Sequence, residues 1–405
     1  MSIKWDRISD EGDAREGAAG PLDGVRVLDI GTMLGAGHCT ALLADFGADV
    51  IHVELPGRGD SLRDMGPFAE GRSLRWAVVG RGKRSITADL RTPEGQARVL
   101  ELAVDADVVV ENYRPGTLER WNIGYAELKR ANPGVILLRV TGYGQSGPAS
   151  HKPGFGRVLE AVSGLMNSTG SPDGPPTQIG VPLVDYITGT AAAMAVSMAL
   201  YHRDQDPAHE GQQIDVSLYE TVVRMLDSLT SRYSALGDVP ARQGNRYTNV
   251  APSDVFRTRD GRYVFHSSAT QTVFARLARA IGREDMLEDE RYATSAARTM
   301  RIDEVNDIVQ AWFSDHDFTE AVEIMEANDV PVGPVNTIAD VATDAHLLER
   351  KSLVEIEVEG VGPMLMPGLI PKFSRTPGRI RHAGAALGSS DAKPAALDGD
   401  VGEAS

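Results

Sequence analysis

The chain has 405 residues, of which 42% are hydrophobic and 24% charged, a composition typical of globular proteins and a length sufficient for two domains. Its formal net charge of −16 disfavours binding to nucleic acid, because neutralising phosphates requires a basic surface. The single cysteine, Cys39, excludes an intramolecular disulfide and a metal site built from several cysteines.

Strands and helices alternate over the first half of the chain, which is the pattern of a parallel sheet flanked by helices. In chain order we predict a strand at 26–30, a Gly-rich turn at 31–37, a helix at 39–46, a strand at 48–54, a helix at 93–104, a strand at 107–111, a helix at 125–132 and a strand at 135–140. This order predicts a Rossmann-like, doubly wound α/β domain over residues 21–225, completed by about 335–380.

A second, smaller domain is predicted after about residue 240. Two short strands, 253–257 and 262–266, flank the turn Thr258-Arg259-Asp260-Gly261 and indicate a β-hairpin. Charge-rich helical segments follow, so residues 240–330 are expected to form an α+β domain. A further strand pair is expected at 353–359 and 362–366.

Neither a membrane segment nor a metal site is predicted. The N-terminal residues lack the apolar core of a secretory signal, and the Ala-rich stretch 188–200 is too short and too closely flanked by charge to span a bilayer comfortably. The histidines are scattered without metal-ligand spacing. We therefore expect a cytoplasmic protein, with a flexible tail at 1–20 and a disordered tail at 384–405.

One carboxylate has an unusual place in the chain. Asp185 follows the apolar run 181–184 and precedes a long Ala-rich helix that is predicted to begin near Ile187. Free backbone N–H groups at a helix N-terminus stabilise an anion and can hold an oxyanion. Asp185 is therefore either a helix cap, the commoner role, contributing roughly 1 kcal/mol, or a covalent nucleophile for an acyl group.

Two segments favour a pocket for a phosphorylated small molecule. The segment Arg81-Gly82-Lys83-Arg84-Ser85 is expected to be a loop whose three cations approach phosphates closely, although such a segment alone is equally typical of a solvated loop. The segment Glu111-Asn112-Tyr113-Arg114-Pro115-Gly116 follows at the carboxyl end of a strand, where α/β folds place ligands.

A nicotinamide dinucleotide is a weaker alternative ligand. The turn Gly31-x-x-x-Gly35-x-Gly37 and the acidic Glu54 at the end of the second strand fit it loosely. Tyr125 and Lys129 have the spacing of a dehydrogenase pair. A single Tyr-x-x-x-Lys is nearly expected by chance in a chain of this length, so the interpretation is disfavoured.

Several phrases, in order along the chain, resemble the family III CoA-transferases, the group of formyl-CoA transferase and carnitine CoA-transferase with the related 2-methylacyl-CoA racemases. They run from about Gly20 to Pro377 and comprise LLADFGADVIHVE, GRGKRSITADLRTPEG, ADVVVENYRPGTLERWNIGYAEL, NPGVILLRVTGYGQSGP, GLMNSTGSPDGPPTQIG, EGQQIDVSLYETVV, GNRYTNVAPSDVFRTRDGRYV and NDVPVGPVNTIADV. Such extended similarity is specific to the family.

The resemblance implies an acyl-CoA:carboxylate CoA-transferase in which Asp185 is the nucleophile, working through an aspartyl mixed anhydride and an aspartyl-CoA thioester. It implies an acyl-CoA donor and a carboxylic acid acceptor as substrates, no permanently bound cofactor, and an intertwined homodimer. The positions that it implies for coenzyme A contacts are Leu34, Gly35, Ala88, Asp89, Leu90, Arg91, Asn112, Tyr113, Arg114 and Arg120. An acyl-CoA racemase or another isomerase or lyase on the same fold, and a non-catalytic CoA-binding protein, are the alternatives.

The chain departs from the family pattern in the segment Pro153-Gly154-Phe155-Gly156. In the racemases that it resembles, a His and an acid occupy the positions of Phe155 and Gly156, so two-base racemisation loses half of its groups here. Glu160, one helical turn further on, is a candidate replacement for the missing acid.

Overall fold

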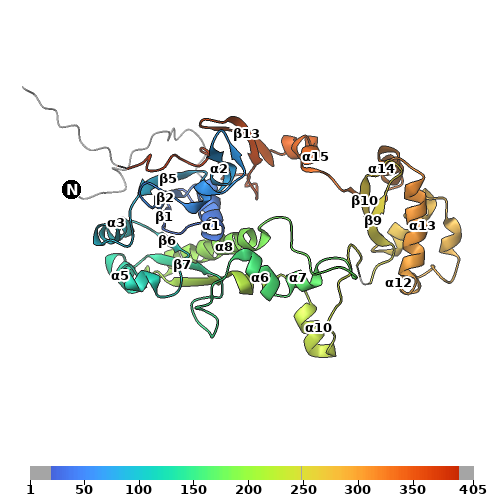
Figure 1. Ribbon diagram of the computed structural model, residues 1–405, viewed down its shortest axis with the longest axis horizontal. Coiled ribbons are helices and arrows are strands. Elements are labelled where there is room, and N and C mark those ends of the chain that lie inside the picture. The colour runs from blue at the N-terminus through green and yellow to red at the C-terminus, as the bar shows by residue number, and fades with distance from the viewer. Residues whose placement is uncertain (1–19, 248, 392–405) are drawn as a thin grey trace, which may run out of the picture. The chain divides into compact units, whose positions relative to one another are not determined.

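The computed structural model describes residues 20–247 and 249–391, and the chain divides into two compact units (Figure 1). The large unit contains the described residues as far as Ser163, together with Ile179–Asp227 and the described residues from Ala345 onward. The small unit contains Gly164–Gln178 and Ser228–Asp344. The units therefore differ from the predicted domains at their edges: 164–178 groups with the small unit, and the large unit resumes near 345 instead of 335.

The large unit holds most of the regular structure. Its elements are β1 (Arg26–Asp29), α1 (Leu34–Asp45), β2 (Asp49–Glu54), η2 (Ser61–Asp64), β3 (Phe68–Ala69), β4 (Arg72–Ser73), α2 (Leu74–Val79), β5 (Lys83–Thr87), α3 (Pro93–Ala103), β6 (Val108–Glu111), α4 (Thr117–Arg120), α5 (Tyr125–Ala131), β7 (Ile136–Thr141), α6 (Gly156–Val162), α8 (Leu183–Gln205), β8 (Gln213–Ser217), α9 (Leu218–Arg224), α16 (Ala345–Glu349), β12 (Leu353–Val358) and β13 (Gly362–Pro367).

A six-stranded parallel sheet in the order β5-β2-β1-β6-β7-β8 forms the centre of the large unit, which confirms the predicted parallel α/β architecture. The strand order reverses between β1 and β6. Open α/β sheets bind ligands in the crevice outside the carboxyl ends of the strands at such a switch point. The segments that follow β1 and β6 are therefore the first place to look for a site.

Side chains alternate between the two faces of these strands, so each face has its own core. On one face, Leu28 and Ile51 pack with Val99 of α3 and Leu128 of α5. The opposite face of β1 carries Asp29, whose carboxylate accepts a hydrogen bond from Thr40 of α1 at 2.6 Å. The sheet thus lies between α3 and α5 on one side and α1 on the other (Figure 1).

Helices α1 and α8 approach each other closely through glycines. A Cβ added at Gly189 of α8 would lie 2.8 Å from the Gly35 carbonyl oxygen and 3.0 Å from His38 Cβ. Helix α1 begins at Leu34, before the predicted start at 39. Residues 34–37 of the expected Gly-rich turn are therefore helical, and only 31–33 remain as the connection from β1. A residue larger than glycine has no room at position 37, because a Cβ there would lie 2.8 Å from Val79 Cγ1.

Helix α8 is long and apolar enough, by length and composition, to cross a membrane. It has 23 residues, a mean hydropathy of 1.4 over its most apolar 18-residue window, and 44% of that window is buried. The predicted stretch 188–200 is the middle of this longer helix, which runs from Leu183 to Gln205. Its buried residues pack against α1 and α9, as those of a core helix do.

The start of the predicted C-terminal tail is folded. Asp391 pairs with Arg98 at 3.0 Å and accepts hydrogen bonds from the Thr87 backbone and hydroxyl groups. The Ser390 backbone N–H donates to the Ser85 carbonyl at 2.9 Å. The prediction of disorder was therefore wrong for 384–391, because these residues are held by contacts with residues about 300 positions earlier in the chain. The rest of the predicted tail, and residues 1–19, lie outside the described residues.

The small unit is an α+β structure around a three-stranded antiparallel sheet in the order β11-β10-β9. Its core brings together Phe256, Val264, Leu277, Val309 and Phe313. Its elements are α7 (Leu165–Ser168), α10 (Leu229–Leu236), β9 (Ser253–Arg257), β10 (Tyr263–Ser267), α11 (Gln271–Ala280), η3 (Glu284–Leu287), α12 (Ser295–Thr299), α13 (Ile302–Ser314), α14 (Phe318–Ala327), β11 (Val332–Pro334) and α15 (Ile338–Ala342).

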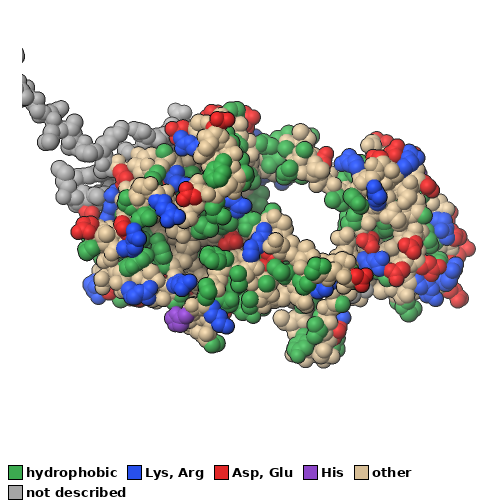
Figure 2. Space-filling view, in the orientation of Figure 1, with side chains coloured by type: hydrophobic (Ala, Val, Ile, Leu, Met, Phe, Trp, Pro, Cys, Tyr) green, Lys and Arg blue, Asp and Glu red, His purple; other side chains and the backbone are tan. Residues whose placement is uncertain are grey.

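Acidic and basic side chains are interspersed over the face of the molecule that is shown in Figure 2. A mixed surface of this kind is typical of solvated proteins, whereas polyanion binding needs clustered cations.

Candidate active site

Asp185 lies inside the first turn of α8, at its third residue, because the helix begins at Leu183. The N-cap is Pro182, and no side chain caps this end of the helix. The predicted start near Ile187 was therefore four residues late, and the interpretation of Asp185 as an N-cap is wrong. Its carboxylate is left without the structural role that the local sequence favoured.

The Asp185 carboxylate packs against two glycines from different helices. A Cβ at Gly156, the first residue of α6, would lie 2.2 Å from Asp185 Oδ2, and one at Gly35 would lie 3.9 Å from Oδ1. Gly156 does not have a positive φ, so its backbone would accept any residue. Only the space that Asp185 occupies demands glycine at this position.

The environment of the carboxylate shifts its acidity. Burial raises the pKa of Asp185 to about 6, opposed by its own backbone N–H and by the charge of Arg157. Among the residues that the structure describes, its carboxylate takes part in no hydrogen bond or ion pair with another side chain. At neutral pH the group is thus mostly ionised, yet only partly solvated, which are properties of reactive carboxylates.

His38 and Tyr186 line the same region, and the sequence did not single them out. Their rings meet edge to face with centroids 4.8 Å apart. Burial, followed by the charges of Arg81 and Lys83, lowers the pKa of His38 to about 4, so the imidazole is neutral at neutral pH. The available signal was spacing: His38 lies one turn after Gly35, and Tyr186 is next to Asp185.

Glu160 is buried and holds the chain segment that leads to α8. Its Oε1 accepts a hydrogen bond from the Ile179 N–H at 2.6 Å, and its Oε2 lies 3.4 Å from Arg157 Nη1. Arg157 also donates to the Ile179 carbonyl. Both polar groups of the Ile179 backbone are therefore bound by α6, six residues before Asp185.

The β1–α1 and β6–α4 connections meet at the switch point of the sheet. The Asn112 side chain accepts a hydrogen bond from the Thr32 N–H at 2.9 Å and donates one to the Thr32 carbonyl at 2.5 Å. Leu34 and Gly35 follow directly, and Gly35 lies beside Asp185. The structure thus places Gly35 beside Asp185 and links Asn112 to the segment that leads to Leu34 and Gly35, although these residues were chosen separately from the sequence.

The other predicted coenzyme A positions lie near carboxyl ends of strands of the same sheet. Tyr113 packs on Trp121 with ring centroids 4.9 Å apart, and Arg114 is exposed. Arg120 is exposed and donates to the Thr117 hydroxyl at 2.9 Å. After β5, Ala88 and Leu90 are buried, whereas the exposed Arg91 forms a two-pronged pair with Asp89. The exposed cations of this set are therefore Arg91, Arg114 and Arg120.

The predicted basic loop at 81–85 does not exist. Residues Lys83–Thr87 form strand β5, and Lys83 is buried with Nζ 3.1 Å from Asp29 Oδ2 and 2.9 Å from the Gly37 carbonyl. Arg81 pairs with Asp45 inside the protein, and Arg84 pairs with Asp49. Lys83 and Arg81 are buried against buried carboxylates, and the mostly buried Arg84 pairs with the partly exposed Asp49, so none of the three is presented to a phosphate.

The groups that suggested a nicotinamide site are also occupied. Glu54 is buried, binds Arg63 through both oxygens at 2.7 Å, and accepts a hydrogen bond from the Ser85 hydroxyl. Tyr125 donates to the Gly211 carbonyl at 2.9 Å, and Lys129 lies 3.5 Å from Glu210. Each has a structural role within the large unit.

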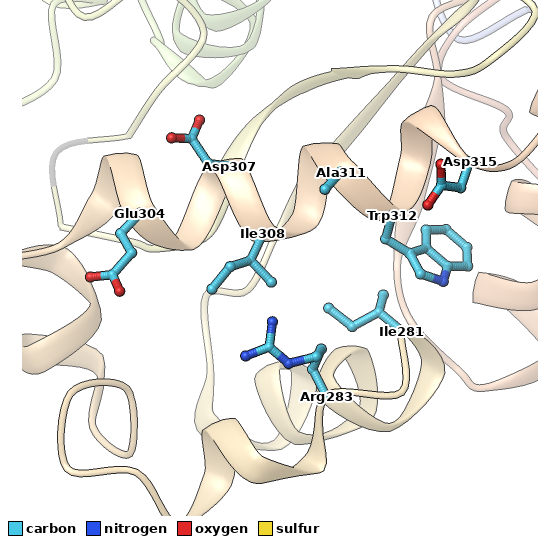
Figure 3. A pocket seen from close by; sticks show the side chains of 8 residues that line it. All are labelled: Ile281, Arg283, Glu304, Asp307, Ile308, Ala311, Trp312 and Asp315. Atoms are coloured by element: carbon cyan, nitrogen blue, oxygen red, sulfur yellow. The ribbon is translucent and has the colours of Figure 1, made fainter.

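A shallow depression of about 700 Å³ occurs in the small unit (Figure 3). Helix α13 forms one wall, and the segment after α11 forms the other. Two of its charged groups have partners: Arg283 pairs with Asp285 at 2.9 Å, and Glu304 with Arg291 at 3.3 Å. It contains no residue that was predicted to be functional.

Comparison with known proteins identifies the class to which this fold and site belong. A family model described as CoA-transferase family III matches residues 22–390. The chain is 42% identical over 369 residues to the succinyl-CoA–D-citramalate CoA-transferase of Chloroflexus aurantiacus, covering 91% of each protein. It is 35% identical over 382 residues to the succinate–glutarate CoA-transferase of Agrobacterium fabrum, covering 92% of this chain and 94% of that protein.

A solved structure agrees with the sequence relatives. The crystal structure of a CAIB/BAIF family protein from Brucella suis superposes with a TM-score of 0.82 at 32% identity, covering 92% of this chain and 97% of that one. Fold and sequence together define an α/β enzyme that acts on CoA thioesters. The chain belongs to CoA-transferase family III, which confirms the predicted family and the predicted enzyme class.

Proposed function

We propose that this enzyme moves CoA from an acyl-CoA donor to a carboxylic acid, with Asp185 as the covalent nucleophile. The observation that carries the proposal is the Asp185 carboxylate itself, which is half-buried, has a pKa of about 6, and caps no helix. A carboxylate in this state is ionised at neutral pH and is only partly solvated. It therefore combines the charge that attack requires with a reduced barrier to desolvation.

The reaction is a series of acyl transfers in which each bond that breaks releases the next nucleophile. The Asp185 carboxylate attacks the donor thioester carbonyl, giving a mixed anhydride and CoA thiolate. The thiolate attacks the Asp185 carbonyl of the anhydride, releasing the donor acid and leaving an aspartyl-CoA thioester. The acceptor carboxylate then attacks this thioester to form a second anhydride, and the thiolate attacks the acceptor carbonyl, releasing acyl-CoA and free Asp185. The activation of the acyl group is kept throughout, so the reaction needs no ATP.

Two helix N-termini supply hydrogen-bond donors beside the reacting groups. Neither α1 nor α8 has a side-chain cap, so the N–H groups of their first turns are not bound by capping side chains. Each attack turns a carbonyl oxygen into an oxyanion, and preorganised N–H donors stabilise that charge more in the transition state than in the ground state. The neutral His38 of α1 packs its ring against that of Tyr186 of α8, the residue next to Asp185.

Coenzyme A is proposed to bind along the carboxyl edge of the sheet. Its thioester would lie by Leu34 and Gly35, beside Asp185, and its phosphates would meet the exposed Arg114 and Arg120, joined by Arg91 when its guanidinium exchanges Asp89 for phosphate. Those guanidiniums are the cations of the predicted set that remain exposed, and guanidinium groups pair well with phosphate. Ala88 and Leu90 then serve as buried supports for the segment that carries Arg91.

The relatives support dicarboxylic substrates. Enzymes from Chloroflexus aurantiacus and Agrobacterium fabrum are named for succinyl-CoA, citramalate, succinate and glutarate. We infer that the donor is a dicarboxylic acyl-CoA such as succinyl-CoA and that the acceptor is a dicarboxylic acid. A mass-spectrometric screen of donors against mono- and dicarboxylic acids tests this, and exclusive use of monocarboxylic acids would contradict it.

Racemisation of 2-methylacyl-CoA is the alternative that the site disfavours. The side chain of Phe155 is 71% exposed and cannot move a proton, and Gly156 offers no acid. Incubating a chiral 2-methylacyl-CoA with the enzyme in deuterated water should therefore give no deuterium at the α-carbon. Rapid exchange would favour the racemase.

We further propose that the enzyme works as an intertwined homodimer, as the resemblance implies. Met194, Met198 and Tyr201 lie on one face of α8, and each is more than half exposed, so a partner subunit would bury an apolar surface there. Light scattering during size-exclusion chromatography checks the mass: a stable monomer at micromolar concentration would refute the dimer.

The central experiment replaces Asp185 by Ala. CoA transfer should be abolished, while calorimetry should show CoA binding with nearly the wild-type affinity. Hydroxylamine or borohydride, added to the wild-type enzyme during turnover, should modify Asp185. Peptide mass spectrometry then identifies the modified residue. Turnover by Asp185→Ala, or modification elsewhere, would remove Asp185 from the mechanism.

A further inference from the structure

Met33, between β1 and α1, has a backbone conformation that residues other than glycine rarely adopt. Its φ is 65° and its ψ is −156°, a region in which a Cβ collides with the neighbouring backbone. Such a conformation persists only where the surroundings enforce it. Met33 is the N-cap of α1, so its conformation sets the direction in which that helix begins.

Asp60 holds Met33 in this conformation. The Met33 N–H lies 3.1 Å from Asp60 Oδ2 and 3.3 Å from Oδ1, and the Leu62 N–H donates to Oδ1 at 2.7 Å. Asp60 is itself only 3% exposed. A buried carboxylate 27 residues along the chain therefore binds the one backbone donor of the strained residue.

Strand β2 fixes Asp60 from two sides. His52 Nε2 lies 3.4 Å from Asp60 Oδ2, and the Glu54 carboxylate accepts the Asp60 N–H at 2.8 Å. The other imidazole nitrogen of His52 lies 3.0 Å from Asp29, a carboxylate that also binds Lys83. A chain of buried charges thus runs from the centre of the sheet to the backbone of Met33.

The residues directly after Met33 form a wall of the active site. Gly35 lies beside the Asp185 carboxylate, and its carbonyl oxygen faces Gly189 of α8. A change in the direction of α1 would therefore move this wall relative to the nucleophile. Misplacement of a reacting group by about 1 Å can cost about a hundredfold in rate.

We propose that Asp60, backed by His52, is a positioning residue that enforces the strained turn at Met33 and so places the start of α1 against Asp185. Asp60 touches no reacting atom in this proposal, and its effect passes through the backbone of Met33 to Leu34 and Gly35. The inference rests on the proposed role of Asp185 as the nucleophile.

Four variants separate positioning from general stability, and one of them, Met33→Gly alone, is the reference for the double variant. Asp60→Asn keeps the size of the side chain but removes its charge and turns one of the two oxygens that accept from the Met33 and Leu62 N–H groups into an NH2, which cannot accept. Met33→Gly/Asp60→Asn adds a residue that adopts the Met33 conformation freely. Asp45→Asn, the matched control, removes a buried carboxylate that pairs with Arg81 at the other end of α1.

The readout is the rate at which the acyl group of a donor thioester is transferred to Asp185, measured in a single turnover by mass spectrometry. Asp60→Asn should slow this step by about tenfold to a hundredfold. Met33→Gly/Asp60→Asn should recover most of the loss, whereas Asp45→Asn should leave the rate within about threefold of wild type. The proposal would be overturned if Asp60→Asn were no slower than Asp45→Asn. It would also be overturned if the double variant showed no recovery although Met33→Gly alone was active.

Two further measurements keep the test decisive. Where Asp60→Asn fails to fold, His52→Gln is used, with a smaller but parallel loss expected and an unchanged rate counting against the proposal. Where wild type forms no adduct with any acyl-CoA, the proposed function fails. Positioning is then decided by amide hydrogen exchange, which should rise at 33–36 in Asp60→Asn but not in Asp45→Asn; equal exchange in the two variants would refute it.

Discussion

The charge of Asp185 should destabilise the folded protein, and this effect can be measured separately from catalysis. The perturbation is Asp185→Asn, which keeps the shape of the side chain and removes its ionisation. The pKa of Asp185 is raised from 3.8 to about 6 by burial. The variant should have no transferase activity, and it should be more stable than wild type at neutral pH.

The sign and size of the change in unfolding free energy follow from proton linkage. Between about pH 4 and pH 6 the unfolded state loses its proton from Asp185 while the folded state keeps it, so the free energy of unfolding of wild type falls as the pH rises. The difference of about two pKa units, at 1.36 kcal/mol each, amounts to about 3 kcal/mol. This loss is complete above the folded pKa and absent below the unfolded one.

Urea denaturation at several pH values measures the effect. Asp185→Asn should exceed wild type in unfolding free energy by up to about 3 kcal/mol at pH 8, and the gain should shrink towards zero as the pH falls to 4. Asp60 is a comparison of opposite sign, because the pKa of that carboxyl is lowered in the fold and Asp60→Asn should be less stable at pH 8. An Asp185→Asn variant no more stable than wild type at pH 8 would refute the claim that the carboxylate is held poorly solvated.

Two further predictions concern the contacts around Asp185. Gly156→Ala places a Cβ 2.2 Å from Asp185 Oδ2, so the carboxylate must turn away and turnover should fall about a hundredfold; the control Gly180→Ala meets open space and should keep wild-type rates, and equal rates in the two variants would contradict the contact. Glu160→Gln keeps an acceptor for the Ile179 N–H, so its turnover should fall less than about tenfold, whereas Glu160→Ala should fall further. Steady-state kinetics distinguishes this bracing role from proton transfer, for which Gln would be as inactive as Ala.

The architecture could be predicted from the sequence because it depends on local patterns. Alternating strands and helices along 26–140 gave the parallel sheet, and the antiparallel hairpin near 258–261 followed from its turn residues. The start of α8 was missed although Pro182 was a usable signal, since proline is common where helices begin. A start at Leu183 would have placed Asp185 inside the helix and weakened the cap interpretation at once.

The basic segment at 81–85 shows what local sequence cannot supply. From the local sequence alone, Lys83 is expected to be a surface charge. The pairing of β5 with β2 instead places it against Asp29, which lies 54 residues earlier in the chain. Arg81 likewise meets Asp45, 36 residues away. Spacing rules cannot detect partners at such separations.

The absence of a side chain at position 156 bears both on the packing of α6 and on the reaction that the site can support. The sequence showed that an acid is missing there, but only the structure shows that Asp185 occupies the space a side chain would need. A carboxylate at 156 would begin with a Cβ 2.2 Å from Asp185 Oδ2, and its charge would then repel the Asp185 carboxylate. Gly156→Asp should therefore lose transfer without gaining α-proton exchange, because a second acid and the present position of Asp185 are mutually exclusive. The packing of α6 against α8 thus leaves no room at 156 for a second carboxylate while Asp185 keeps its present position.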